Sequence, residues 1–258
     1  MQLQLAGKTA FVSGSTQGIG FAIAKALADE GVAVTVNGRD EGRVRSAVER
    51  LGARAKGIVA DFGASEQVKS LLAELGDVDI LVNNVGLFEV APFDAVTDDA
   101  WQRYFDVNVM SGVRLSRALL PGMLERGWGR VIFISSESGV NVPPDMVHYG
   151  TTKAGMLALG NGLAKLTRGT GVTVNSILGG PTFSDGVAGA VAHIADAQGM
   201  DADALKAAII GGNATSLLQR FIDPAEIASL AVYLASPVSS ATNGAALRAD
   251  GGVLTGVL

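Results

Sequence analysis

Short apolar runs rich in β-branched residues alternate with longer segments of helical periodicity along the chain. The candidate strands are Thr9–Ser13, Val32–Asn37, Ala53–Val59, Ile80–Asn83, Val131–Ser135, Thr173–Leu178 and Ala245–Arg248. Most of these runs are continuously apolar, which is typical of parallel strands covered on both faces. The candidate helices between them are Gly18–Glu30, Asp40–Leu51, Ser65–Leu75, Asp98–Leu120, Val147–Thr167 and Pro224–Ala235. This alternation predicts an α/β fold with a doubly wound parallel sheet of about seven strands.

No linker, repeat or low-complexity tract divides the sequence, so we expect a single domain over residues 1–258. The one long departure from the alternation is the segment Pro181–Ala214, which is rich in alanine and glycine. Long insertions at the carboxyl ends of parallel strands often cover a site. We therefore expect a substrate lid over about residues 181–214, with a mere surface excursion as the alternative.

The composition excludes several kinds of site and partner. The chain has no cysteine and only 2 histidines, which leaves no ligands for a thiolate or histidine-rich metal centre. The formal net charge of -5, without a run of basic residues, argues against binding to nucleic acid. No apolar stretch approaches the ~18–20 residues of a membrane helix, and the N-terminus has no signal-peptide pattern. We expect a cytoplasmic protein with a small-molecule substrate and no metal.

A glycine-rich turn joins the first candidate strand to the first candidate helix, with the sequence Gly14-Ser15-Thr16-Gln17-Gly18-Ile19-Gly20. Gly14 permits the tight turn, Gly18 lets the backbone approach a diphosphate, and Gly20 allows close contact between helix and strand. The N-terminus of the helix offers free N–H groups and the positive end of its dipole to the phosphates. A purely structural turn is the alternative, but the position after the first strand favours dinucleotide binding.

The end of the second candidate strand reads Asn37-Gly38-Arg39 and carries no carboxylate to accept hydrogen bonds from an adenosine ribose. Arg39 stands where a guanidinium can bind a 2′-phosphate in a bidentate manner. A solvated surface arginine is the alternative. The missing acid and the added base together favour NADP(H) over NAD(H).

Tyr149 and Lys153 are four residues apart in a helical segment, so their side chains share one face. Ser136 ends the fifth candidate strand, where it can reach the same carboxyl edge of the sheet. A nearby ammonium favours the phenolate and lowers its pKa, which suits general acid–base catalysis. The alternative is a buried tyrosine with a satisfied hydroxyl beside a solvated lysine. The neighbours Ser135 and Ser138 compete with Ser136 for the third position.

The order and spacing of these motifs resemble the short-chain dehydrogenase/reductase family, and its 3-oxoacyl reductases in particular, over essentially the whole chain. The residues that carry the resemblance are Gly14, Gly18, Ile19, Gly20, Asn83, Asn84, Val85, Gly86, Asn108, Ser136, Tyr149, Lys153, Asp250, Gly251 and Gly252. The resemblance implies a Rossmann-type NAD(P)-binding domain.

The resemblance also implies roles for individual residues. Tyr149 would be the general acid–base, Ser136 would orient the substrate oxygen, and Lys153 would bind the nicotinamide ribose and lower the pKa of Tyr149. Asn108 would complete a proton relay through water. The residues implied to bind the cofactor are Gly14, Thr16, Gln17, Gly18, Ile19, Gly20, Arg39, Asp61, Phe62, Asn83, Asn84, Gly86, Tyr149, Lys153, Gly180 and Thr182.

Three residues depart from the family pattern. Val85 replaces the usual alanine after the asparagine pair, and Gly179 replaces the usual proline after the sixth strand. The second change puts the role of Thr182, and of Ser184, at the carboxamide in question. Glu137, directly after Ser136, adds a carboxylate that is either solvated and inert or selects a polar or cationic substrate group.

These observations favour an NADP(H)-dependent oxidoreductase that interconverts a carbonyl and a secondary alcohol by hydride transfer. The alternatives are a non-catalytic NADP-binding regulator and a redox-neutral dehydratase or epimerase. The apolar residues of the lid favour a non-ionic, moderately hydrophobic carbonyl substrate. The helix Val147–Thr167 has leucines pointing in several directions and three interior glycines, and the end of the chain is apolar. Both features predict a homotetramer, with a dimer as the alternative.

Overall fold

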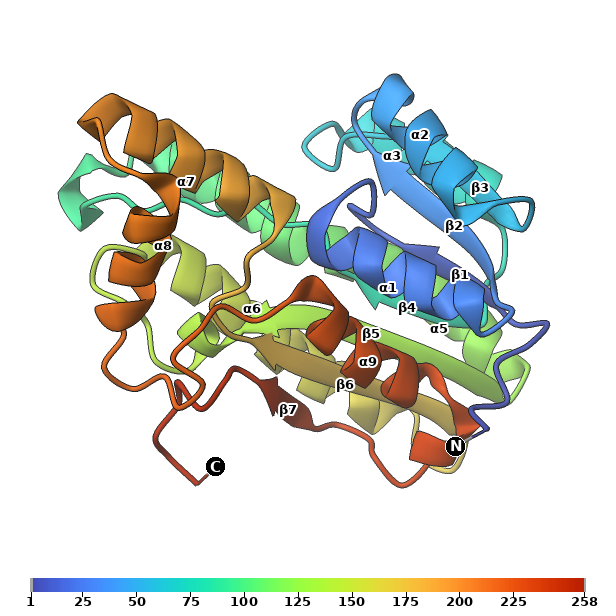
Figure 1. Ribbon diagram of the computed structural model, residues 1–258. Helices are drawn as coiled ribbons and strands as arrows, with labels where there is room; N and C mark the ends of the chain where they lie inside the picture. The colour runs from blue at the N-terminus through green and yellow to red at the C-terminus, as the bar shows by residue number, and fades with distance from the viewer. Residues whose placement is uncertain (1, 258) are drawn as a thin grey trace.

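Seven parallel strands form one sheet in the order β3-β2-β1-β4-β5-β6-β7, within the residues 2–257 that the computed structural model describes (Figure 1). The strands are β1 (Thr9–Val12), β2 (Ala33–Gly38), β3 (Ala55–Val59), β4 (Ile80–Asn83), β5 (Trp128–Ser136), β6 (Gly171–Gly179) and β7 (Ala246–Ala249). The strand order reverses between β1 and β4, where the carboxyl ends of the strands form the crevice in which α/β folds bind ligands. The predicted single-domain, doubly wound sheet is confirmed.

Two layers of helices cover the sheet, and each buries an apolar cluster against it. On one face lie α1 (Gly18–Asp29), α2 (Glu41–Leu51) and α9 (Pro224–Ala235). On the other face lie α3 (Ser65–Leu75), α5 (Met110–Glu125) and α6 (Val147–Leu166). Because both faces are covered, β5 and β6 are buried along almost their entire length, which explains their continuous apolar sequences.

The predicted helix Asp98–Leu120 is wrong in one respect, because the structure divides it. The short helix α4 (Asp98–Tyr104) runs into a π-helical turn, Phe105–Val109, before α5 begins. Such a turn holds an extra residue and is common at functional sites. Asn108 lies in this turn and bonds to distant parts of the chain. Apolar periodicity reports only local spacing, so it could not reveal the break.

Helix starts follow the expected capping chemistry. Thr97 Oγ1 accepts a hydrogen bond of 3.2 Å from the backbone N–H of Ala100 at the start of α4. The Asp223 side chain caps α9, and Glu226 Oε2 accepts a hydrogen bond of 2.9 Å from the Asp223 N–H. Both caps satisfy backbone N–H groups that the first turn of a helix leaves without a partner.

The excursion after β6 contains two further helices, α7 (Asp185–Gln198) and α8 (Ala202–Gly211). They project beyond the carboxyl edge of the sheet, on the left of Figure 1. This position places them over the edge at which the glycine turn and the end of β5 lie.

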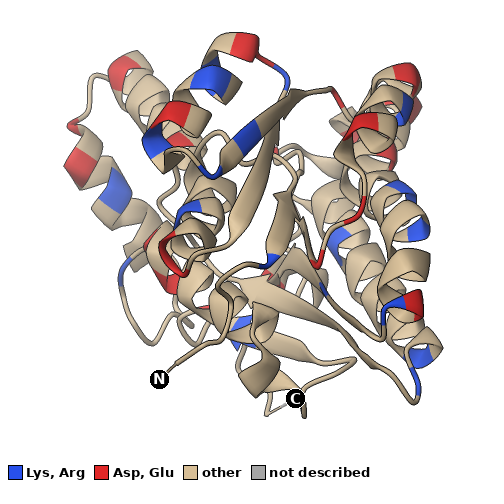
Figure 2. Cartoon of the chain, turned by 90° about the vertical axis from the view of Figure 1, so that its right-hand side faces the viewer, with Lys and Arg blue, Asp and Glu red and all other residues tan. Residues whose placement is uncertain are grey.

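Most Lys, Arg, Asp and Glu residues lie on the helices and on the loops, and few lie on the strands of the sheet (Figure 2). Across residues 2–257, no helix is both long enough and apolar enough to cross a membrane. The same residues contain no grouping of three or more His, Cys, Asp or Glu side chains suited to holding a metal ion.

Candidate active site

The glycine turn between β1 and α1 has the backbone geometry that its sequence predicts. Gly14 and Gly18 adopt positive φ angles of 61° and 58°, a region that side chains other than glycine rarely enter. A Cβ atom on Gly20 would lie 2.4 Å from both the Gly14 carbonyl oxygen and Asn84 Nδ2. Helix α1 can therefore approach the turn this closely only with glycine at position 20.

Side chains from β2 and from the end of β4 hold this turn in place. Asn84 Nδ2 donates to the carbonyl oxygens of Ser13 and Gly14, both at 2.9 Å. Asn37 Oδ1 accepts from the Gly14 N–H at 3.1 Å. Both amide hydrogens of Asn84 are thus used inside the protein. These two bonds position the turn, whereas the family resemblance assigns Asn84 to the cofactor.

Helix α7 meets the glycine turn through a charged contact. Asp185, the first residue of α7, accepts a hydrogen bond of 2.6 Å from the backbone N–H of Gly18. A carboxylate oxygen held by this N–H demonstrates that the turn accepts an anionic oxygen, as a diphosphate would require. Sequence reasoning missed Asp185, because nothing local connects it with a residue 167 positions earlier.

The adenosine side of the turn is basic and exposed. Arg39 Nη1 lies 3.8 Å from Asp61 Oδ2, and 67% of the Arg39 side chain is exposed. Arg43, in the first turn of α2, donates to Gln17 Oε1 at 3.3 Å. Arg43 was not among the predicted residues, although its spacing of four from Arg39 is a usable signal. The Phe62 ring is only 2% exposed within an apolar cluster, so it takes no part in this surface.

Ser136, Tyr149 and Lys153 come together at the carboxyl edge of the sheet, as predicted. Ser136 ends β5, and Tyr149 and Lys153 lie one turn apart on α6. Lys153 Nζ lies 5.6 Å from the Tyr149 ring centroid and donates to the Ile134 carbonyl oxygen at 2.9 Å. Ser136 is close enough to the Tyr149 phenol to act on its pKa, which its hydroxyl lowers. Of the competing serines, Ser135 donates instead to the Lys153 carbonyl oxygen at 3.0 Å.

Burial controls the ionisation of this group. It raises the pKa of the Tyr149 phenol above its usual range, and the neighbouring Ser136 hydroxyl only partly offsets the effect. Burial also lowers the pKa of Lys153 to about 8, against the opposing charge of Glu137. The expectation that Lys153 lowers the pKa of Tyr149 is therefore not met in this structure. The loss of hydration of the phenolate is the largest influence on this pKa, and the negative charge of Glu137 adds to it.

The Glu137 carboxylate lies against Ser136 and Ser138 rather than in open solvent. Its Oε2 accepts a short hydrogen bond from Ser136 Oγ, and its Oε1 accepts one of 3.2 Å from Ser138 Oγ. Burial raises the pKa of Glu137, and the bonds from both serines oppose that rise. These contacts show that the carboxylate is held by the protein instead of being freely solvated.

Asn108 is fully buried in the π turn and ties two segments together. Its Oδ1 accepts from the Leu87 N–H at 2.7 Å, and its Nδ2 donates to the Leu87 carbonyl oxygen and to Thr152 Oγ1. Thr152 Oγ1 in turn donates to the Tyr149 carbonyl oxygen at 2.7 Å. The amide of Asn108 therefore joins the loop after β4 to α6. Gly86 lies beside this contact, with its ideal Cβ position 3.5 Å from Lys153 Nζ.

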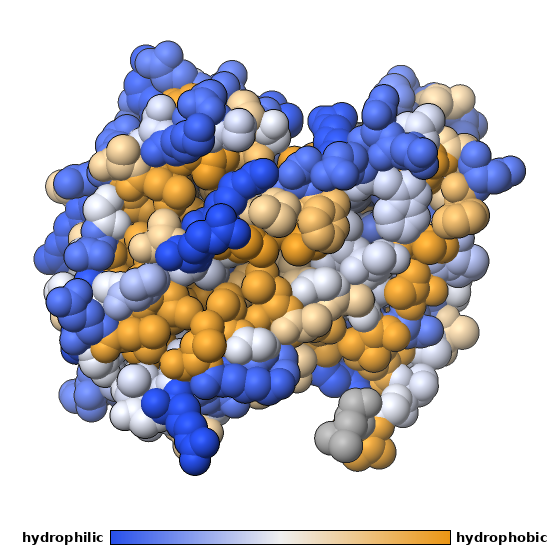
Figure 3. Space-filling view, turned by 180° about the vertical axis from the view of Figure 1, so that it is seen from behind, coloured by the Kyte–Doolittle hydropathy of each residue, from blue (hydrophilic) through white to orange (hydrophobic). Residues whose placement is uncertain are grey.

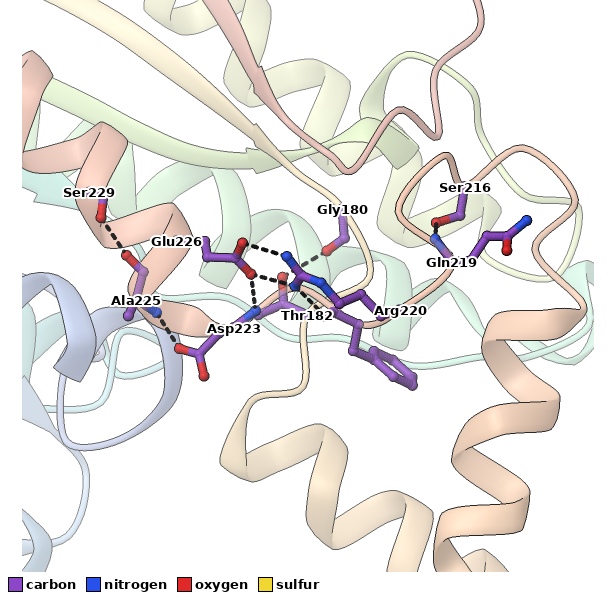
Figure 4. A network of polar contacts seen from close by, with 10 residues as sticks. Gly180, Thr182, Ser216, Gln219, Arg220, Asp223, Ala225, Glu226 and Ser229 are labelled. Atoms are coloured by element: carbon purple, nitrogen blue, oxygen red, sulfur yellow. Dashed lines mark hydrogen bonds and ion pairs between the residues drawn. The ribbon is translucent and has the colours of Figure 1, made fainter.

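The loop after β6 is organised by internal packing. A Cβ atom on Gly180 would lie 2.5 Å from the Asp250 carbonyl oxygen, and Thr182 Oγ1 donates back to the Gly180 carbonyl oxygen at 2.8 Å. Figure 4 shows this turn beside the ion pair between Arg220 and Glu226. The Thr182 hydroxyl is committed to the loop rather than turned toward a carboxamide.

Aromatic side chains form a wall beside Tyr149. Phe88 meets Tyr149 edge to face, with ring centroids 5.4 Å apart, and is 58% exposed. His148 is buried and packs edge to face on Tyr104, with ring centroids 4.5 Å apart. Burial and the nearby Glu89 raise the pKa of Tyr104 to about 12. The surroundings of Tyr149 and Ser136 therefore combine aromatic side chains with the carboxylate of Glu137.

The crevice suits a dinucleotide. The glycine turn with the Asp185 carboxylate on it lies on one side of this crevice. Asn83 is the last residue of β4, at the point where the strand order reverses. Both of its polar atoms are buried without a hydrogen-bond partner among the described residues. Buried amides are nearly always paired, so an unpaired amide here is consistent with a site for a polar ligand.

Comparison with known proteins adds independent information. The chain matches the family model described as short chain dehydrogenase over residues 8–194. It is 45% identical to the uncharacterized oxidoreductase YvrD of Bacillus subtilis, covering 98% of this chain and 99% of the relative. It is 32% identical to D-beta-hydroxybutyrate dehydrogenase of Cupriavidus necator, covering 96% and 98% of the two chains. The structure of L-sorbose reductase from Gluconobacter frateurii, complexed with NADPH and L-sorbose, matches with a TM-score of 0.93 at 30% identity over 100% of both chains.

Proposed function

Because the chain belongs to the short-chain dehydrogenase family, we propose that it is an NADP(H)-dependent oxidoreductase that interconverts a carbonyl and a secondary alcohol. The observation that carries this proposal is the meeting of Ser136, Tyr149 and Lys153 at the carboxyl edge of the sheet. The reductase that binds NADPH and L-sorbose supports it, since that ligand is a ketone. A ketoreductase structure with NADPH, 29% identical with a TM-score of 0.87, supports the same cofactor.

In the proposed reduction, bound NADPH supplies a hydride to the carbonyl carbon. Tyr149 donates the proton that the carbonyl oxygen takes up, so that C=O becomes CH–OH. Because burial raises the pKa of Tyr149, the phenol is protonated at neutral pH and ready to act as the acid. Ser136 holds the substrate oxygen beside it. Lys153, with a pKa of about 8, carries a positive charge at neutral pH that stabilises the phenolate left on Tyr149 once its proton has been transferred.

The proposed preference for NADP(H) rests on the end of β2. The ribose-binding carboxylate is absent there, and Arg39 and Arg43 stand on the exposed rim beside Gln17 of the glycine turn. Two guanidinium groups are suited to a 2′-phosphate. We assign α7 and α8 to a substrate lid, since Asp185 brings the lid to the edge of the cofactor crevice.

A panel of ketones and alcohols, followed by NADPH absorbance, tests the proposal. In Tyr149→Phe, kcat should fall by roughly 10²–10⁴-fold, the usual contribution of a positioned acid–base, while the Kd for NADPH stays within a factor of about two. Tyr233→Phe, on α9, is the matched control and should keep wild-type turnover.

Retained activity in Tyr149→Phe would show that Tyr149 is not the proton donor. Substrate conversion without a change in NADPH absorbance would favour the redox-neutral alternative. A wild type that binds NADPH and converts no compound of the panel would favour the non-catalytic regulator.

A further inference from the structure

Glu137 places a carboxylate in direct contact with the hydroxyl that is to hold the substrate. Ser136 Oγ donates to Glu137 Oε2, and Ser138 Oγ donates to Oε1 at 3.2 Å. Glu137 is the first residue of the short helical turn Glu137–Gly139 that follows β5. The backbone therefore fixes this residue beside the end of the strand. A carboxylate in this position must take part in any contact that Ser136 makes.

The hydrogen atoms of this contact can be counted. A serine hydroxyl has one hydrogen to donate, and that of Ser136 is held by Glu137. The oxygen of Ser136 already accepts from the Ser138 N–H at 3.1 Å. To donate to a substrate carbonyl, Ser136 must withdraw its hydrogen from Glu137. The Oε2 atom then loses a donor inside a partly desolvated site, which is unfavourable for a charged acceptor unless another donor replaces it.

We propose that Glu137 is a specificity-determining residue that selects carbonyl substrates with a hydroxyl group on the carbon next to the carbonyl. Such a hydroxyl replaces the donor that Ser136 withdraws. A ketone with a methyl group in place of the hydroxymethyl group leaves Oε2 without a partner. A keto acid, with a carboxylate at the same position, brings a like charge to Glu137. This inference rests on the proposed function and narrows its substrate to neutral α-hydroxy ketones.

The other charged groups nearby do not neutralise Glu137 from the substrate side. Lys153 is buried and donates to the Ile134 carbonyl oxygen. Glu89 and Arg103 both act on Tyr104, farther along the aromatic wall, and their charges oppose each other there. An anionic substrate group would therefore find no free cation beside Ser136 among these residues.

Three ketones that differ at one carbon provide the test: 1-hydroxybutan-2-one, butan-2-one and the anion 2-oxobutanoate. Each is reduced with NADPH, and the ratios of kcat/KM are compared, because ratios cancel any loss of active protein. The wild type should prefer the hydroxy ketone to the plain ketone, and the plain ketone to the keto acid, by about tenfold each. In Glu137→Ala the hydroxyl preference should fall below about threefold, and in Glu137→Gln the keto acid should gain about tenfold.

Glu137→Gln is nearly isosteric and is expected to fold, which thermal unfolding and the Kd for NADPH check. Glu89→Gln, which removes a carboxylate that contacts Tyr104 instead, should leave all three ratios within about twofold. Unchanged ratios in the Glu137 variants, or equal changes in Glu89→Gln, would overturn the assignment. A wild type that reduces butan-2-one without a hydroxyl preference would overturn it while the proposed function stands. A wild type that binds NADPH and reduces none of the three would overturn this substrate class, and the wider ketone panel then decides the function.

Discussion

The carboxylate of Asp185 accepts a hydrogen bond of 2.6 Å from the backbone N–H of Gly18. This bond joins the first residue of α7 to the turn that would hold the cofactor diphosphate. A phosphate oxygen and the Asp185 carboxylate would compete for the same donor, and their charges repel. In this conformation, Asp185 therefore opposes cofactor binding and must move for a diphosphate to occupy the turn.

Replacing Asp185 with alanine should tighten NADPH binding several-fold, because the competing anion is removed from the Gly18 N–H. Fluorescence titration of NADPH gives the Kd. Asp196→Ala, at the other end of the same helix, removes an equal charge and should leave the Kd within about twofold. Weaker binding in Asp185→Ala would contradict the competition.

Arg39→Asp should shift the cofactor preference from NADP(H) toward NAD(H) by at least about tenfold in kcat/KM, because a charge-assisted phosphate contact is lost and a ribose acceptor is gained. The measurement is the ratio of the two kcat/KM values with a single ketone. Arg45→Asp, an exposed residue on α2 with the same change of charge, serves as the control. A wild type that prefers NAD(H) would show that the rim formed by Arg39 and Arg43 does not select the cofactor.

Lys153 should make stability depend on pH in a predictable direction. Burial lowers its pKa from 10.5 to about 8, so the unfolded chain holds this proton more tightly between those values. Stability should therefore rise with pH across this window, relative to Lys153→Met, by on the order of 3 kcal/mol in total. Below about pH 8 the cost of the buried charge is fully present.

Urea unfolding of the cofactor-free protein between about pH 7 and pH 10 checks this expectation. The series stops there because the raised pKa of Tyr149 acts in the opposite direction at higher pH. Lys165→Met, an exposed lysine on the same helix, should show a constant difference from the wild type. A constant difference for Lys153→Met as well would contradict the buried charge.

We expect a homotetramer, so light scattering should give four times the mass of one chain. The alternative, a dimer, would give twice the mass of one chain. Helix α6 leaves Gly162 facing open space and Leu166 63% exposed. Figure 3 shows broad apolar areas on the surface seen from behind. If another chain packs on Gly162, Gly162→Leu should lower the mass, whereas Gly189→Leu, equally open but on α7, should not. A monodisperse species of single-chain mass would refute the oligomer.

The local parts of the site were predictable because their signals are local. Strand and helix periods, the caps at Thr97 and Asp223, and the helical spacing of Tyr149 and Lys153 need only neighbouring residues. The geometry of the glycine turn follows in the same way, since a left-handed φ at Gly14 is a property of the residue itself. These features fixed the fold class and the place of the site.

Residue roles that depend on distant partners were not predictable. Phe62 and Asn84 were both expected to bind the cofactor. The Phe62 side chain is buried, and the Asn84 amide holds the turn through Ser13 and Gly14. No local pattern could show the π turn that places Asn108 against Leu87. Each of these outcomes is decided by a segment about twenty or more residues away.

The sequence by itself determined which residue types stand at the carboxyl ends of the strands, since alternation and turn chemistry act over a few positions. Only the tertiary structure decided what those residues face. It set Asp185 on Gly18 and buried the phenol of Tyr149 so that its pKa rises instead of falling. The physical reason is that hydration and charge–charge interactions depend on distances through space, and spacing along the chain does not report those distances.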